Sequence, residues 1–351
     1  MAEPRSKVVQ PGTIGVYHCI SRCVRRAFLC GYDHYTGQSY EHRRGWVQNR
    51  IYELSNLFGV DVFAYAIMSN HSHIVLRNRP DLAAQWTARE VAERWCQVFP
   101  GSHRVGDDAW NLRVESLIRD PARLAEVRAR LADISWFMRC LNEWIARRAN
   151  HEDECSGHFW EGRFRCQALV DEGAILACMV YVDLNPVRAA LASGLEDSCF
   201  TSVYDRLNAR RAEERLRALG PLERPTQAQR REMDRETEKI SAAAWLAPLS
   251  QTKPFGLSLD LDRYLDLVQW TLRALPGSQP GDVPMAVERV LDRFSLDAQR
   301  WAENVAAYGS LFHRIVGRSE RLAEEARQRG QRWFRGQAGS RRLYGQSRQA
   351  A

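Results

Sequence analysis

Two short segments of this 351-residue chain carry side chains whose types and spacing could do chemistry. The first is residues 62–76, an apolar stretch rich in β-branched and aromatic residues that contains His71 and His73. A turn signal, Ser69-Asn70, divides the stretch into two expected strands. Residues i and i+2 of a strand face the same side, so the two imidazoles could bind one divalent cation. Ordinary surface histidines at the start of a strand would show the same spacing, so both interpretations stay open.

The second segment contains a possible nucleophile. Residues 172–181 have the apolar pattern of a helix, and Tyr181 and Asn185 stand at i and i+4, so they could share a face. A tyrosine hydroxyl close to a metal-bound phosphate can attack it and form a phosphotyrosine. Pro186 disfavours helical geometry at Asn185, and Asn-Pro is also typical of an N-cap at the start of a helix. Asn185 could therefore cap a helix, bind a metal, or do both, and Tyr181 taken alone could be a core aromatic residue.

Four motifs follow one another in a fixed order between residues 12 and 205. They are residues 17–22 (YHCISR), 68–74 (MSNHSHI), 158–164 (HFWEGRF) and 181–189 (YVDLNPVRA). Together they resemble the ordered motifs of the single-tyrosine HUH transposases, and within these the branch of the REP-associated tyrosine transposases. The order of all four motifs makes this resemblance far more specific than any single motif.

The resemblance implies an α+β fold with a ferredoxin-like antiparallel sheet core that binds single-stranded or hairpin DNA. It also implies that His71, His73 and Asn185 are ligands of Mg²⁺ or Mn²⁺. Tyr181 is then the nucleophile. The implied reaction is a metal-assisted transesterification that leaves a 3′-hydroxyl and a 5′-phosphotyrosine and needs no ATP.

Two positions depart from the pattern of the family. Ser72 replaces the usual bulky apolar residue between the histidines, and Ser69 stands where relatives often have proline. Neither change removes a chemical group that the reaction needs. Two other functions stay compatible with the sequence. One is a domesticated protein that binds hairpin DNA without cutting it. The other is an RNA-processing nuclease that uses the histidines as acid and base and works in EDTA.

Composition and local charge favour a nucleic-acid partner. The formal net charge is +7 and the pI is about 9.0. Arginine is suited to phosphate and guanine recognition, although overall charge by itself is weak evidence. Arg163 and Arg165 flank Phe164, which like Trp160 could stack on unpaired bases; alternatively Phe159, Trp160 and Phe164 belong to the core. The candidate DNA-binding residues are Arg22, Arg25, Arg26, Trp160, Arg163, Arg165 and Arg188.

The patterns of apolar residues and turn signals predict the order of the elements and three parts of the chain. Residues 1–205 are expected to form the catalytic domain, residues 206–254 a charged linker or solvated helix, and residues 255–351 a mainly helical extension. The expected elements are a strand and a loop from residue 12, a helix at 40–58, the two strands of 62–76, a helical insertion at about 81–130, a helix at 134–148, the last core strand within 157–170 and the helix at 172–181. The extension ends in a basic, aromatic tail that could contact DNA or only solubilise the protein.

The cysteines and the N-terminus indicate a cytoplasmic protein. Residues 1–5 are polar and lack the apolar region of a secretory signal, and no stretch is long enough to span a membrane. We expect the nine cysteines to be free and mostly buried, because disulfides are rare in the cytosol. Loose groups of His and Cys within 18–34 and 151–158 leave a structural zinc site open. The sequence is compatible with a monomer and with a homodimer that donates its tyrosine helix to a neighbouring site.

Overall fold

A computed structural model of the chain describes residues 8–24, 28–34, 37–101, 104–220, 225–250, 256–276 and 282–345. Arg25 and Arg26, two of the predicted DNA-binding residues, lie outside the described residues. The chain divides into two compact units. The first consists of Met1–Val62, Ser69–Ser72 and Leu76–Cys166, and the second of Phe63–Met68, His73–Val75 and Gln167–Ala351.

Five strands form one sheet in the order β2-β3-β1-β4-β5. Their bounds are β1 Gly15–Arg22, β2 Val60–Ile67, β3 His71–Asn78, β4 Arg165–Leu169 and β5 Ile315–Val316. With α1 (His42–Leu57) after β1 and α6 (Ile134–Glu152) before β4, the first four strands give the chain order βαββαβ. That order, with β1 and β3 at the centre of the four, is the ferredoxin-like arrangement. The sheet is mostly antiparallel, so the predicted α+β fold class is confirmed.

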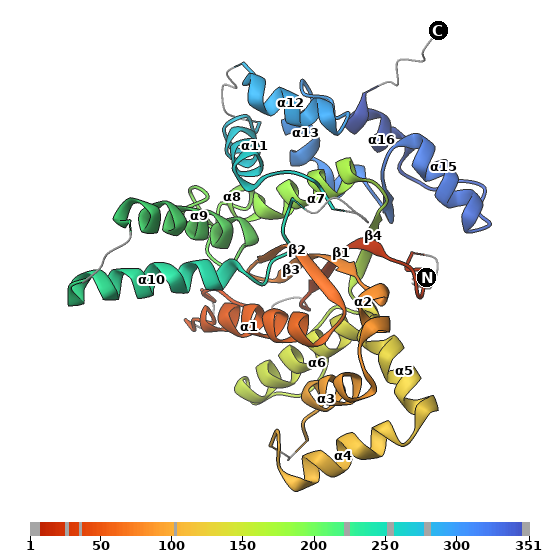
Figure 1. The fold of residues 1–351 in the computed structure, drawn as a ribbon. Coiled ribbons are helices and arrows are strands. Elements are labelled where there is room, and N and C mark those ends of the chain that lie inside the picture. The colour runs from red at the N-terminus through yellow and green to blue at the C-terminus, as the bar shows by residue number, and fades with distance from the viewer. Residues whose placement is uncertain are drawn as a thin grey trace. The chain divides into compact units, whose positions relative to one another are not determined.

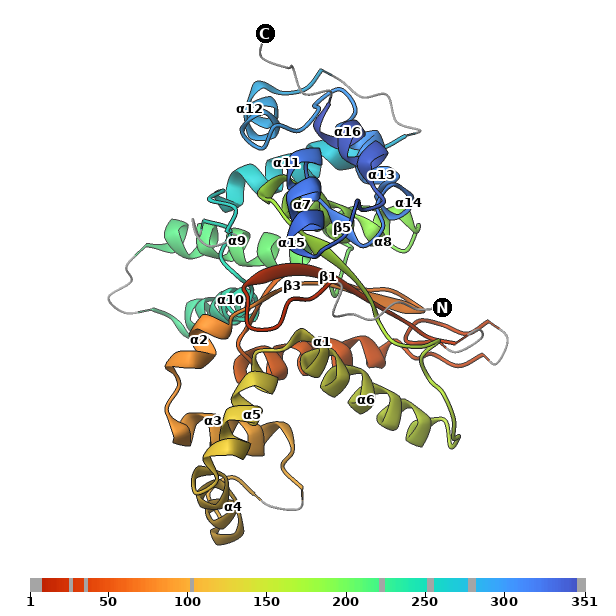
Figure 2. The same cartoon turned by 90° about the vertical axis from the view of Figure 1, so that its right-hand side faces the viewer.

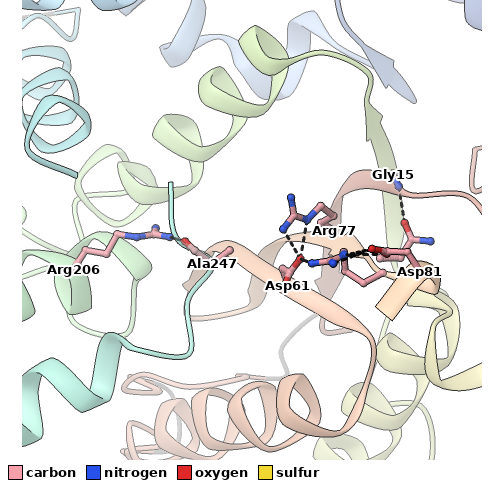
Figure 3. A network of polar contacts seen from close by, with 8 residues as sticks. Gly15, Asp61, Arg77, Asp81, Arg206 and Ala247 are labelled. Carbon is pink, nitrogen blue, oxygen red and sulfur yellow. Dashed lines mark hydrogen bonds and ion pairs between the residues drawn. The ribbon is translucent and has the colours of Figure 1, made fainter. Parts of the chain in front are cut away.

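The strands β2 and β3 form the expected hairpin around Ser69-Asn70, and nearly all their residues are buried. Buried strands appear in the sequence as apolar runs, and the short polar turn between β2 and β3 fixes their register. At the far end of β3, Arg77 is only 1% exposed and donates to Asp61 at 2.7 Å. Asp61 also binds Arg79, which pairs with Asp81 (Figure 3). The buried guanidinium of Arg77 is therefore compensated by a carboxylate, as burial of a charge requires.

The helical insertion between β3 and α6 is present. It comprises α2 Pro80–Gln85, α3 Ala88–Val98, α4 Asp108–Ile118 and α5 Pro121–Leu131. Thr87 and Glu90 close a capping box that begins α3, and Asp107 caps α4. The insertion has a small core of its own in which α3 packs on α4 (Figure 1); its buried members are Ala92, Cys96, Trp110 and Val114.

The second unit contains the remaining helices. They are α7 Glu172–Asp183, α8 Asn185–Arg188, α9 Ser202–Leu219, α10 Gln227–Ala243, α11 Leu261–Arg273, α12 Met285–Arg293, α13 Trp301–Ala306, α14 Tyr308–Leu311, α15 Ser319–Gln328 and α16 Gln337–Tyr344. The helices α9 and α10 lie side by side (Figure 1), and α9 begins before residue 205, where the predicted boundary falls. Among the described residues, none of the helices combines the length and apolar character that crossing a bilayer requires.

Residues 157–170 contain β4, the last strand of the predicted core, as expected. The sheet also contains a fifth strand that the sequence patterns do not indicate. The strand β5 comes from the C-terminal extension and pairs parallel with β4, with Ala168 opposite Ile315 and Leu169 opposite Val316. Gln167 Nε2 adds a hydrogen bond to the carbonyl of Phe312 at 3.2 Å. Two strand residues cannot show a period-2 pattern, so no periodicity in the sequence could indicate this pairing.

Candidate active site

The helix α7 carries the predicted nucleophile in its last turn. Asp171 caps the helix by accepting from the amide of Ala174 at 2.8 Å, and Glu172 in the first turn suits the positive end of the helix dipole. Glu172 and Tyr181 are the two residues of α7 that are not buried. A helix that is apolar all round is normally enclosed. The half-buried phenol of Tyr181 is therefore the exception on this helix.

Asn185 does not cap a helix with its side chain. The one-turn helix α8 begins at Asn185 with Pro186 in its first turn, and its N-cap is Leu184. The buried Asn185 amide instead lies against the histidine of β3, with Nδ2 of Asn185 3.2 Å from Nε2 of His73. Asn185 is helical although it precedes Pro186, contrary to the expectation from that proline. The side chain of Asn185 therefore does not cap α8, and its role as a metal ligand stays a prediction.

Within the second unit, His73, Tyr181, Asn185 and Arg188 form one cluster. The ring of Tyr181 stands edge-on to the ring of His73, with 5.7 Å between centroids and 88° between planes. The guanidinium carbon of Arg188 lies 4.9 Å from the centroid of the Tyr181 ring. Residues that are separate in the sequence therefore place a phenol, an imidazole, an amide and a guanidinium side by side.

His71 occupies the first position of β3, two residues before His73, so strand geometry puts the two side chains on the same face of that strand. Its Nδ1 lies 2.7 Å from Oδ1 of Asn70. That oxygen can only accept, so Nδ1 carries the proton and Nε2 keeps its lone pair. Burial, together with the nearby Arg22, lowers the pKa of His71 to about 4. The imidazole is therefore neutral near pH 7, as a metal ligand must be.

The first unit contains Arg22, Trp160, Arg163 and Arg165. Arg22, Arg163 and Arg165 are exposed. Trp160 is half-buried, and its Nε1 donates to the carbonyl of Asn142 at 2.8 Å. Both neighbouring phenylalanines are buried in the core. The proposal that Phe164 stacks on bases is therefore wrong, because its ring already packs against protein.

The basic tail contains arginines in two different states. Arg329 forms an ion pair with Glu325 at 2.7 Å, and Arg342 approaches Glu303 at 3.5 Å. Trp333, in contrast, is 63% exposed, and Arg332 and Arg335 on either side of it are also exposed. The tail therefore presents one aromatic ring to solvent between positive charges.

Three residues beside the cluster, Tyr308, Gly309 and Asp183, are not among the site residues predicted from the sequence. The ring of Tyr308 stacks on the ring of Tyr181 with 4.8 Å between centroids, and the next residue, Gly309, lies close to the Tyr181 hydroxyl. The buried carboxylate of Asp183 accepts from the amide of Val203 at 3.1 Å and from the hydroxyls of Ser202 and Tyr264. Asp183 lies inside the fourth motif, so its place in the motif was the one available hint.

Within the part of the chain that the structure describes, no three His, Cys, Asp or Glu side chains gather closely enough to hold a metal ion. The groups around residues 18–34 and 151–158 thus form no zinc site among the described residues. All nine cysteines are free thiols, and six of them are buried. Burial raises the pKa of Cys30 and of Cys178 to about 12. In the predicted metal site, two ligands are the histidines His71 and His73, and the third is the side-chain amide of Asn185.

No family model matches the chain, and no curated protein matches it. Among solved structures, the chain matches one of a REP-associated tyrosine transposase bound to a REP hairpin. The sequences are 14% identical, the match covers 65% of this chain and 93% of that chain, and the TM-score is 0.32.

Proposed function

We propose that this protein cleaves and rejoins single-stranded or hairpin DNA through a covalent bond to Tyr181, with the help of a divalent cation. The observation that carries the proposal is the cluster at the end of α7. Tyr181, a half-buried phenol in the last turn of a buried helix, lies against the ring of His73, and His73 lies against the amide of Asn185. The four ordered motifs support the same conclusion.

The chemistry is an exchange of esters. The phenolic oxygen of Tyr181 attacks a backbone phosphorus, a bond forms between phosphorus and Tyr181, and the bond to the 3′ oxygen breaks. The proton of the phenol is finally bound by that oxygen, which leaves as a 3′-hydroxyl. A second 3′-hydroxyl can attack the phosphotyrosine and reverse the step, which joins the strands. No bond energy is lost to water, so ATP is not required.

The residues that would hold Mg²⁺ or Mn²⁺ are His71, His73 and Asn185. Three observations fit this role. His71 is neutral and carries its proton on Nδ1, which Asn70 holds, as outer partners of metal-binding histidines do. His73 is buried and lies on the same strand face. The amide of Asn185 faces His73, and rotating it by half a turn presents its oxygen. When bound, the cation supplies polarisation of a non-bridging phosphate oxygen.

Arg188 is placed to bind the phosphate that Tyr181 attacks. Its guanidinium lies over the Tyr181 ring and donates to the carbonyl of Ala306, which holds the side chain in one orientation. A guanidinium suits phosphate because its planar fork matches two oxygens. Arg188, named from the sequence as a DNA contact, thus lies at the nucleophile itself.

The test uses a pool of labelled DNA hairpins with randomised single-stranded flanks, incubated with the protein and Mg²⁺ or Mn²⁺. We expect a protein–DNA adduct that survives denaturing electrophoresis and disappears in EDTA. Tyr181→Phe should abolish the adduct, whereas Tyr52→Phe, on the exposed part of α1, should leave it unchanged. An adduct formed by Tyr181→Phe would overturn the assignment of the nucleophile. Hairpin binding without any adduct would instead favour a binding protein, and cleavage in EDTA would favour an acid–base nuclease.

A further inference from the structure

The C-terminal extension contacts the nucleophile directly through the corner between α13 and α14. The helix α13 packs on α7 within the second unit (Figure 2). Tyr308, the first residue of α14, is 1% exposed, and its ring is stacked on that of Tyr181 with 4.8 Å between centroids and 26° between planes. A Cβ atom added to Gly309 would lie 3.0 Å from the Tyr181 hydroxyl. The corner therefore contacts both the ring face and the reactive oxygen of Tyr181.

Other contacts anchor this corner. Trp301, at the start of α13 and fully buried, donates from Nε1 to the hydroxyl of Thr271 on α11 at 2.8 Å. Asn304 donates to the carbonyl of Arg342 on α16 at 2.9 Å. Neighbouring helices of the extension thus hold the corner from several directions.

Arg188 contacts both this corner and the ring of Tyr181. Its guanidinium lies 4.9 Å from the centroid of the Tyr181 ring and donates to the carbonyl of Ala306, at the end of α13. The torsion that turns a tyrosine ring, χ2, has a broad preference, so neighbouring groups decide the orientation of the ring. Here those groups are Tyr308, Arg188 and the edge contact with His73.

We propose that Tyr308 and Gly309 are positioning residues for Tyr181, so that the C-terminal extension is part of the active site. The inference rests on the proposed function. Tyr308 fixes the plane of the Tyr181 ring, and Gly309 leaves the space that the hydroxyl occupies. In-line attack needs the nucleophilic oxygen in a narrow range of positions, and a misplacement of about 1 Å can cost about 100-fold in rate. A methyl group at position 309 would push that oxygen by a few tenths of an ångström.

The experiment compares single-turnover rates of adduct formation and hairpin affinities of four variants. Gly309→Ala and Tyr308→Leu should slow adduct formation by about 10- to 100-fold while the Kd for the hairpin changes little. Tyr308→Phe keeps the ring and should retain the rate of the wild type. Gly45→Ala is the matched control, because Gly45 also lies in a helix and no atom lies within 4 Å of an added Cβ.

A full rate in Gly309→Ala, or a rate that falls only in step with affinity, would overturn the proposal. A second measurement needs no reaction. With 3-fluorotyrosine incorporated and the resonance of Tyr181 assigned by its loss in Tyr181→Phe, ¹⁹F NMR reports how fast the ring turns. We expect slow turning in the wild type and in Tyr308→Phe, and fast turning in Tyr308→Leu. Equal ring motion in all three proteins would overturn the positioning role even if no adduct formed. Absence of an adduct from the wild type, in contrast, counts against the proposed function.

Discussion

Arginine lies over an aromatic ring in two helical regions, and the groups that surround the ring differ between them. The guanidinium carbons of Arg130, on α5, and of Arg139, on α6, lie 4.3 Å and 4.9 Å from the centroid of the ring of Trp136, on α6. Each of these arginines also has an acidic partner on a neighbouring turn. At the end of α7, Arg188 lies over Tyr181 at a similar distance, but it donates to a main-chain carbonyl.

The difference lies in what else touches the ring. Trp136 is half-buried on an amphipathic helix, where the exposed Arg139 and Arg147 pair with Glu143. Tyr181 is stacked on a buried tyrosine and stands edge-on to a buried histidine, on a helix with almost no other exposed residue. A guanidinium over a ring is therefore common surface packing. What distinguishes Tyr181, the candidate nucleophile, is its buried polar surroundings.

The largest effect is expected where the end of α7 is held. Asp183→Ala removes a fully buried carboxylate from the amide of Val203 and from the hydroxyls of Ser202 and Tyr264. The donors left unpaired should lower the free energy of unfolding by about 3 to 5 kcal/mol. Urea denaturation followed by circular dichroism measures the change.

Asp234→Ala is the control for that measurement, because Asp234 is exposed on α10 and a substitution there should cost less than about 0.5 kcal/mol. If Asp183→Ala unfolds within 1 kcal/mol of the wild type, then the end of α7 is not held by this network. The contrast with the surface of α6 would then rest on the aromatic contacts alone.

An intermediate effect is expected at Trp333, an exposed ring between two exposed arginines. If the tail stacks on unpaired bases, Trp333→Ala should weaken binding of single-stranded DNA by about 1 to 3 kcal/mol. Replacing Arg332 should reduce the dependence of affinity on salt by about one counterion. Fluorescence anisotropy at several salt concentrations measures both. Met285→Ala, equally exposed on α12, should bind as the wild type does. Unchanged affinity in Trp333→Ala would indicate a tail that only solubilises the protein.

The smallest effect is expected on the outer face of α6. Glu143→Ala removes ion pairs with Arg139 and Arg147, whose side chains are 63% and 80% exposed. Exposed pairs of this kind contribute about 0.3 to 0.5 kcal/mol, so the urea midpoint should hardly move. A loss above about 1.5 kcal/mol would show that the arginine and tryptophan contacts of α6 act together, and the contrast with Tyr181 would weaken.

Much of the fold follows from short-range patterns in the sequence. The hairpin β2–β3 is visible because two apolar runs flank a polar two-residue turn, and α6 is visible from its apolar stripe. The strand β5 is not visible, because two residues have no period. Phe164 was misplaced because arginines on both sides made an aromatic residue look exposed, whereas its ring is buried. Charge on neighbouring residues says little about where a ring points.

For the candidate site, the sequence by itself determined the chemical groups and their order: the histidine pair on a strand, the tyrosine in the last turn of a helix, and Asn185 followed by Pro186. These depend on local spacing, which strand and helix geometry convert directly into direction. Only the tertiary structure decided that Asn185 faces His73 rather than capping α8, and that Tyr308 and Gly309 contact Tyr181. Contacts between residues far apart in the chain arise from packing, and side-chain spacing along the sequence does not encode them.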